Sequence, residues 1–148
     1  MKATPKQLLA APFLIVALGL ARAMVLGVPF RMYAGIFGSD APRAEHATII
    51  SADFDARYRA KARRLGALIE TLARRTPWNS NCLAQAIVAA VCLRMMGIAY
   101  HVHFGVASSS RGEGALDAHS WVMAGDVPVT GFREAQAMIP VRAFHWLA

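Results

Sequence analysis

The stretch Asn79-Ser80-Asn81-Cys82-Leu83-Ala84-Gln85-Ala86, which continues in apolar residues up to Gly97, decides how this chain folds. It opens with three consecutive residues that cap helix N-termini well, and Gly97 is a typical residue at which a helix ends. The sequence between them predicts a helix over residues 82–96. This helix is apolar almost all round, as is typical of a helix buried on every side. We therefore expect the other elements to pack around it.

The hydrophobic pattern changes on both sides of this central helix. Before it, apolar residues at helical spacing predict an amphipathic helix up to about Arg75, which Thr76-Pro77 terminates. After it, residues 98–106, 118–123 and 127–130 read as strands, with a polar loop at 108–114 and a turn at Gly125-Asp126. Helices followed by an antiparallel meander predict an α+β fold.

The composition fits one folded domain. The chain has 148 residues, of which 56% are hydrophobic and 17% charged. These values exclude a disordered chain, a coiled coil and a collagen-like chain. We expect an apolar N-terminal helical segment over residues 1–42 and the main domain over 43–148. A turn-rich stretch, Gly38-Ser39-Asp40-Ala41-Pro42, precedes the boundary.

The N-terminal segment is open to three interpretations. Between residues 8 and 30 the only charged side chain is Arg22, and Lys2 and Lys6 precede the apolar run. A signal sequence would have this form, with Ala21-Arg22-Ala23 as a cleavage site. A membrane helix would need Arg22 inside it. We favour one or two core helices, broken near Pro29.

The two cysteines indicate the redox environment in which the protein is found. Cys82 and Cys92 lie ten residues apart on one predicted helix, which separates their Cα atoms by about 15 Å. A disulfide needs less than about 7 Å, so these thiols cannot pair with each other. Free thiols favour a reducing, cytoplasmic location, with membrane contact through residues 8–30 left open.

The charge would tolerate an acidic partner, which could be a nucleic acid, an anionic membrane face or an acidic peptide, and does not choose among them. The net charge is +7, and the helix before Thr76 carries a basic face. A solvated surface is the plain interpretation, and binding of an acidic peptide is the functional one. Nucleic acid is not expected, because no recognised binding motif accompanies the charge. The basic residues are Arg57, Arg59, Lys61, Arg63, Arg64 and Arg74.

Cys82 and His119 are the candidate catalytic residues. The free amides and the dipole of a helix N-terminus stabilise an anion, and for Cys82 that anion is the nucleophilic thiolate. His119 lies on a predicted strand, in Ala118-His119-Ser120-Trp121. A cysteine on a helix N-terminus that faces a histidine on a strand resembles the arrangement in papain-like and transglutaminase-like enzymes.

The surrounding residues resemble one family more closely. They are Pro77 to Ala86, Arg94-Met95-Met96-Gly97-Ile98, Gly105-Val106, Ala118-His119-Ser120-Trp121-Val122 and Val129-Thr130-Gly131. This pattern, within about residues 60–135, resembles the lasso-peptide biosynthesis B proteins, which are leader peptidases with a transglutaminase-like fold.

The resemblance implies a function and partners. Cys82 would be the nucleophile and His119 the base of a cysteine peptidase that removes the leader from a ribosomal precursor peptide. An ATP-dependent cyclase would then close the lasso. Some family members carry a leader-recognition domain, which the short apolar segment here does not resemble, so a separate recognition protein is implied. A peptide-presenting scaffold without catalytic activity and an unrelated membrane-attached protein are the alternatives.

The residue that orients His119 stays unassigned at this point. With Gly125-Asp126 as a two-residue loop, Trp121 would face Thr130, and Asp126 would lie about 20 Å from His119 along the strand. Asp117 is nearer, at about 6–7 Å on the same strand face. Both carboxylates are kept as candidates.

No cofactor or metal is expected. His101 and His103 alternate on a strand and share one face, but a zinc site needs at least one further ligand. Cys82 could supply it only by giving up its role as nucleophile. Cys92 lies about 80° around the helix from Cys82, so we expect it to be a core residue.

Overall fold

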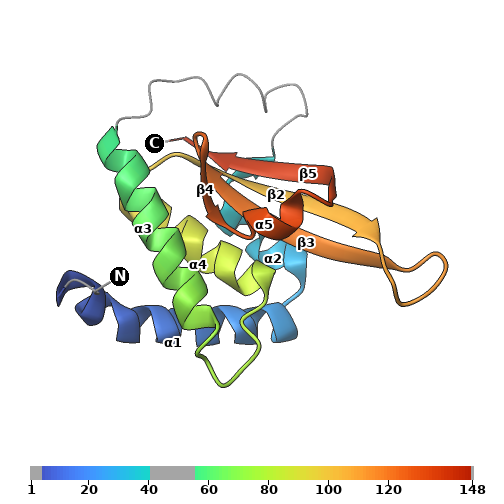
Figure 1. The fold of residues 1–148 in the computed structure, drawn as a ribbon, viewed down its shortest axis with the longest axis horizontal. Coiled ribbons are helices and arrows are strands. Elements are labelled where there is room, and N and C mark those ends of the chain that lie inside the picture. Colours follow the sequence, from blue (N-terminus) through green and yellow to red (C-terminus); the bar gives the residue numbers. More distant parts are fainter. Residues whose placement is uncertain (1–4, 41–55, 148) are drawn as a thin grey trace.

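The computed structural model describes residues 5–40 and 56–147, and its centre is helix α4 (Cys82–Met95). Asn81 caps α4: its Oδ1 accepts a hydrogen bond from the Ala84 amide over 3.0 Å. The helix ends at Met96, and Gly97 follows with a positive φ of 64°. In Figure 1, α4 lies between the other long helices and the sheet, and it contacts α1, α3 and three strands. The prediction of a buried central helix is confirmed.

The sheet has five antiparallel strands in the order β1-β5-β2-β3-β4. Strands β2 (Tyr100–Ser108), β3 (Leu116–Ala124) and β4 (Val127–Thr130) form the predicted meander. Two strands were not predicted. They are β5 (Ile139–Trp146), which pairs with the other side of β2, and the short β1 (Ser39–Asp40), which pairs with β5. Helices packed on one antiparallel sheet confirm the α+β fold class.

The register of β3 against β4 differs from the simple hairpin. The two-residue turn is as predicted, because Ala124 pairs with Val127. The pairing then shifts between Val122 and Met123, so that Val122, rather than Trp121, lies opposite Thr130. The shift follows from an extra residue on β4, a β-bulge. The expected pairing of Trp121 with Thr130 is therefore wrong, and the change moves the residues after β4 relative to His119.

The N-terminal segment begins with the long helix α1 (Pro5–Gly27). After a break at Pro29 come the single-turn helix α2 (Phe30–Tyr33) and a 3₁₀ turn, η1 (Ala34–Phe37). The buried side of α1 carries Leu14, Leu18 and Ala21, and the helix packs against α3 and α4.

The opposite side of α1 is also apolar but is exposed to solvent. Phe13, Val16 and Leu20 are 59%, 60% and 68% exposed. Within the described residues, α1 is the one helix long and apolar enough to cross a membrane, judged by length and composition. Only 17% of its most apolar 18-residue stretch is buried. The helix is thus a core element on one side only.

Helix α3 (Ala56–Ala73) packs against α4 and β4. Its closest approach to the sheet is at Gly66, where a Cβ atom would lie 2.1 Å from the Val129 carbonyl oxygen. A glycine in mid-helix costs about 1 kcal/mol relative to alanine, but here the missing side chain allows the close contact. It fixes the distance between α3, which lines the site described below, and β4.

We expect Gly66→Ala to destabilise the protein by about 1–3 kcal/mol, because the added methyl group forces α3 away from the β4 backbone. Urea denaturation followed by circular dichroism measures this change. Gly27→Ala is the matched control, since a Cβ at this helical glycine meets no atom within 4 Å. Equal stability of Gly66→Ala and the parent protein would show that the helix and strand are not in close contact.

Candidate active site

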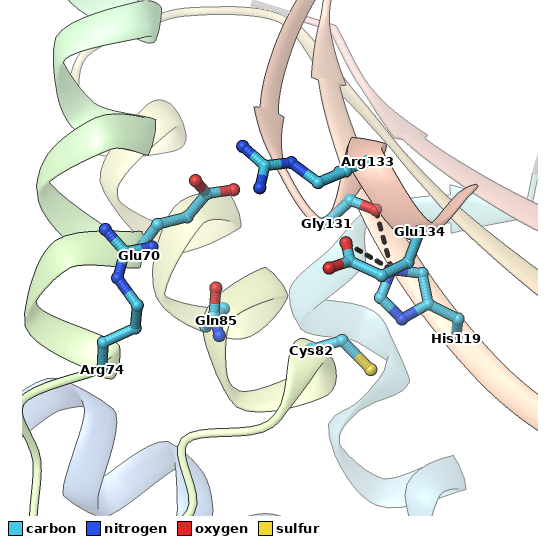
Figure 2. Close-up of a pocket in the computed structure, with 8 residues that line it drawn as sticks. All are labelled: Glu70, Arg74, Cys82, Gln85, His119, Gly131, Arg133 and Glu134. Atoms are coloured by element: carbon cyan, nitrogen blue, oxygen red, sulfur yellow. Dashed lines mark hydrogen bonds and ion pairs between the residues drawn. The ribbon is translucent and has the colours of Figure 1, made fainter. Parts of the chain in front are cut away.

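A pocket of about 460 Å³ opens at the N-terminus of α4 (Figure 2). Three parts of the fold meet there: the C-terminal half of α3, the start of α4, and the end of the β3–β4 hairpin with the short helix α5 (Phe132–Ala135). The structure therefore brings the two predicted catalytic residues, Cys82 and His119, into one pocket. The lining residues are Glu70, Arg74, Cys82, Gln85, His119, Gly131, Arg133 and Glu134.

Cys82 is the first residue of α4, and its side chain is partly exposed to the pocket. The loop before it is held by hydrogen bonds. The Thr76 hydroxyl donates to the Ala73 carbonyl over 2.9 Å and lies 2.8 Å from the Ser80 hydroxyl. The side-chain Nε2 of Gln85 donates to the Ser80 carbonyl over 2.8 Å. These bonds fix the position of the thiol.

The start of α4 also presents free backbone donors. The Ala84 and Gln85 amides both donate to Asn81, through its side chain and its carbonyl. The N–H groups of Cys82 and Leu83 then have no acceptor within the described residues. Unpaired amides at a helix N-terminus stabilise negative charge, so these two could hold an oxyanion that forms beside the Cys82 sulfur.

His119 has a defined tautomer. Its Nε2 lies 2.7 Å from the Gly131 carbonyl oxygen. Because a carbonyl can only accept, Nε2 carries the hydrogen, and in the neutral ring Nδ1 keeps a free lone pair. Figure 2 shows Nδ1 on the side of the ring that faces Cys82. The Trp121 ring stacks on the imidazole at a centroid distance of 6.4 Å and an angle of 17°. The His119 side chain is 11% exposed.

An acidic residue that sequence analysis did not propose lies beside His119. The Glu134 Oε2 atom is 3.8 Å from Nε2, close enough for an ion pair when the ring is protonated. The bulge in β4 and the positive φ of Gly131, 70°, turn the chain so that the Gly131 carbonyl and Glu134 approach the ring from one side. The signal for it in the sequence is that Glu134 comes soon after β4, the strand that pairs with the His119 strand β3.

The two carboxylates considered from the sequence lie elsewhere. Asp117 forms an ion pair with Arg111, and Asp126 forms one with Arg59 at 2.5 Å. The hydrogen bond from Arg59 holds the pKa of Asp126 below its usual value. Neither residue lines the pocket, because Asp117 faces the β2–β3 loop and Asp126 sits in the turn beside α3.

The remaining candidate residues lie outside the pocket. Cys92 is half-buried against the core, and burial raises the pKa of its thiol. His101 and His103 lie near each other, with ring centroids 6.2 Å apart, and His103 stacks on Trp121. In residues 5–40 and 56–147 no group of three or more His, Cys, Asp or Glu side chains could hold a metal ion. The rings of His101, His103 and Trp121 form a row of contacts that ends at His119.

Comparison with known proteins gives one family. The family model for the transglutaminase-like superfamily matches residues 24–142, which include every residue of the pocket. The chain belongs to the transglutaminase-like superfamily. This superfamily includes cysteine peptidases, and its cysteine chemistry fits a thiol at a helix N-terminus with a histidine beside it. No curated protein and no solved structure matches the chain.

Membership of the transglutaminase-like superfamily agrees with the fold described above. The match begins near the end of α1 and ends within β5, so it spans α3, α4 and most of the sheet. The finer likeness to lasso-peptide leader peptidases goes beyond this family match and is treated as a proposal below.

Proposed function

We propose that this protein is a cysteine peptidase in which Cys82 is the nucleophile and His119 the general base and acid. The observation that carries the proposal is the hydrogen bond from His119 Nε2 to the Gly131 carbonyl. It holds the ring in the tautomer whose Nδ1 can take a proton from Cys82, on the side where Cys82 lies (Figure 2).

In this mechanism Nδ1 of His119 accepts the thiol proton, and the Cys82 thiolate attacks the carbonyl carbon of the scissile bond. The oxyanion forms next to the free Cys82 and Leu83 amides, which donate to it. The imidazolium then protonates the leaving amine, and a thioester remains on Cys82. His119 next removes a proton from water, which attacks the thioester and releases the carboxylic acid product. The thiol then recovers its proton from the imidazolium.

Glu134 and Gly131 take the place of an orienting carboxylate in this scheme. The carbonyl of Gly131 fixes the tautomer, and the charge of Glu134 stabilises the imidazolium that forms during each half of the reaction. Glu134 is thus a positioning residue, because it acts through His119. Its distance of 3.8 Å and its 59% exposure make its contribution smaller than that of a buried aspartate.

We further propose that the substrate is a ribosomal precursor peptide whose leader is removed at this site. Three of the five segments that carry the resemblance to lasso-peptide leader peptidases support this, because each contributes a residue to the pocket. The segment 77–86 builds the Cys82 turn and the start of α4, residues 118–122 carry His119 and its stacking partner Trp121, and residues 129–131 end at the carbonyl that binds His119. A separate leader-recognition protein and an ATP-dependent cyclase are the proposed partners.

One observation favours a second candidate, a peptide-presenting scaffold without catalytic activity in the same pathway. The His119 Nε2 bonds to a backbone carbonyl, whereas the nearest carboxylate stands 3.8 Å away and is exposed. Both a scaffold and a peptidase would bind the peptide at this site. The assay below must therefore detect cleavage rather than binding.

Incubation of the purified protein with a precursor peptide, with and without the candidate recognition protein, tests the proposed function. We expect mass spectrometry to show slow cleavage by the protein alone and much faster cleavage with the partner. The partner tethers the leader and raises the effective concentration of the scissile bond to about the millimolar range. Peptide that stays intact under both conditions, although it binds, would favour the scaffold and overturn the peptidase proposal.

The outer face of α1 is a proposed contact with a lipid surface. It presents Phe13, Val16 and Leu20 to solvent on a protein of net charge +7, a combination that suits an anionic membrane. The buried face of the same helix packs against α3 and α4, so this contact would leave the pocket assembled.

A further inference from the structure

The pocket around Cys82 continues along α3 into a second hollow. This hollow, of about 250 Å³, lies between α3, β4 and α5, and it shares Glu70 and Arg133 with the first pocket. The two together form one groove that leads away from the thiol, which we call the α3 groove. Its outer part is lined by Arg63, Ala67, Glu70, Pro128, Val129, Thr130, Phe132 and Arg133.

The α3 groove contains guanidinium groups that form no ion pair within the described residues. Arg63, Arg74 and Arg133 line it and are exposed, and their guanidinium groups make no ion pair or hydrogen bond within the described residues. The charge of Arg63 acts on Asp126 only from a distance, because Arg59 holds the hydrogen bond and ion pair to that carboxylate. By contrast, Arg59 on the same helix is paired with Asp126. The three guanidinium groups of the α3 groove therefore remain available to a ligand.

The carboxylates of the α3 groove do not balance this charge. Glu134 stands beside His119, and Glu70 is the one other acidic residue that lines either hollow. Figure 2 shows the Arg133 side chain reaching across the pocket toward Glu70. These two residues line both hollows. A ligand that enters along α3 would pass close to Arg133 before it reaches the thiol.

Apolar contacts are available beside these charges. Phe132 is 38% exposed at the outer hollow, and Pro128 on β4 is exposed next to it. A groove with free guanidinium groups and a partly open aromatic ring suits a peptide segment that carries carboxylates among apolar residues. Guanidinium groups bind carboxylates with two parallel hydrogen bonds, which favours them over neutral amides.

We propose that the α3 groove binds an acidic segment of the peptide substrate next to the scissile bond, and that Arg63 and Arg133 determine this specificity. The inference rests on the proposed peptidase function, since it assigns the substrate class of the same site. A carboxylate held by Arg133 would place the neighbouring peptide bond in the part of the groove that Cys82 and His119 line.

A binding measurement tests the inference without any need for turnover. A fluorescent acidic peptide, and its counterpart with each Asp changed to Asn, are titrated against the Cys82→Ser protein and followed by anisotropy. We expect the acidic peptide to bind more tightly and its affinity to fall with rising salt. Arg63→Glu should weaken acidic-peptide binding about tenfold, and Arg133→Gln about threefold, with little effect on the neutral peptide.

Arg64→Glu is the matched control, because Arg64 is exposed on the same helix but lines neither hollow. Equal affinity for the two peptides would overturn the inference, as would equal losses in Arg63→Glu and Arg64→Glu, which would show that overall charge rather than the α3 groove attracts the peptide. Because no bond is cleaved in this experiment, its result is independent of whether the protein proves to be a peptidase.

Discussion

Replacing Cys82 with alanine is expected to reduce peptide hydrolysis at least about 10³-fold, to the background rate. No other thiol reaches the pocket, because Cys92 lies against the core and burial raises its pKa. The fold should survive, since the cap of α4 is made by Asn81 and the helix is buried through its later residues. Release of leader peptide by liquid chromatography measures activity, and circular dichroism measures folding.

Cys92→Ala is the matched control for this substitution. It removes the other thiol of the same helix and should keep activity while costing about 1 kcal/mol of stability from the lost core contacts. If folded Cys82→Ala cleaved precursor as fast as the parent protein, the nucleophile would have to be another group.

His119→Ala is expected to lower kcat about 10²–10⁴-fold, the usual contribution of a positioned acid–base group. Without the imidazole, the pocket loses the group placed to take the Cys82 proton and to protonate the leaving amine. Initial rates with saturating precursor measure the effect. The loss should fall mainly on kcat, because His119 acts on the reacting atoms rather than on distant parts of the peptide.

Three carboxamide variants compare Glu134, which lies beside His119, with the two carboxylates considered from the sequence. Glu134→Gln should lower kcat by about threefold to tenfold, because the Gly131 carbonyl still fixes the tautomer. Asp117→Asn and Asp126→Asn should leave kcat unchanged, since these residues pair with Arg111 and Arg59. A loss in either control as large as that in Glu134→Gln would contradict the assignment of Glu134.

The central helix and the meander could be predicted because their signals are local. The capping residues before Cys82 and the glycine after Met96 mark both ends of α4, and alternating apolar residues mark the strands. Strand β5 was not predicted. Its first four residues are exposed, and its place beside β2 depends on a long-range pairing that no short motif encodes.

Cys82 and His119 could be proposed as a pair from the sequence, but Glu134, the acidic residue near His119, could not. Counting residues along an ideal hairpin gave the wrong partner for Trp121, because the extra residue on β4 shifts the register. That shift, with the left-handed conformation of Gly131, brings a carbonyl and Glu134 to the ring. A bulge changes local pairing without a distinctive composition, so it had to be seen in the structure.

Composition also left the role of α1 open. A helix that is apolar all round fits a membrane, a signal or a core equally well. Packing divides α1 into a buried side at Leu14 and Leu18 and an exposed side at Phe13 and Leu20. Only the positions of α3 and α4 distinguish these two sides, and the residues of α1 alone do not.

Labelling of the nucleophile with an electrophilic substrate analogue tests the central claim, that Cys82 attacks the substrate carbonyl with the help of His119, most directly. A precursor-derived peptide with an electrophilic ketone in place of the scissile bond is incubated with the protein, and the modified residue is located by mass spectrometry. The account predicts one adduct, on Cys82, that forms much more slowly in His119→Ala. An adduct on Cys92, or labelling of Cys82 at the same rate in His119→Ala and in the parent protein, would contradict it.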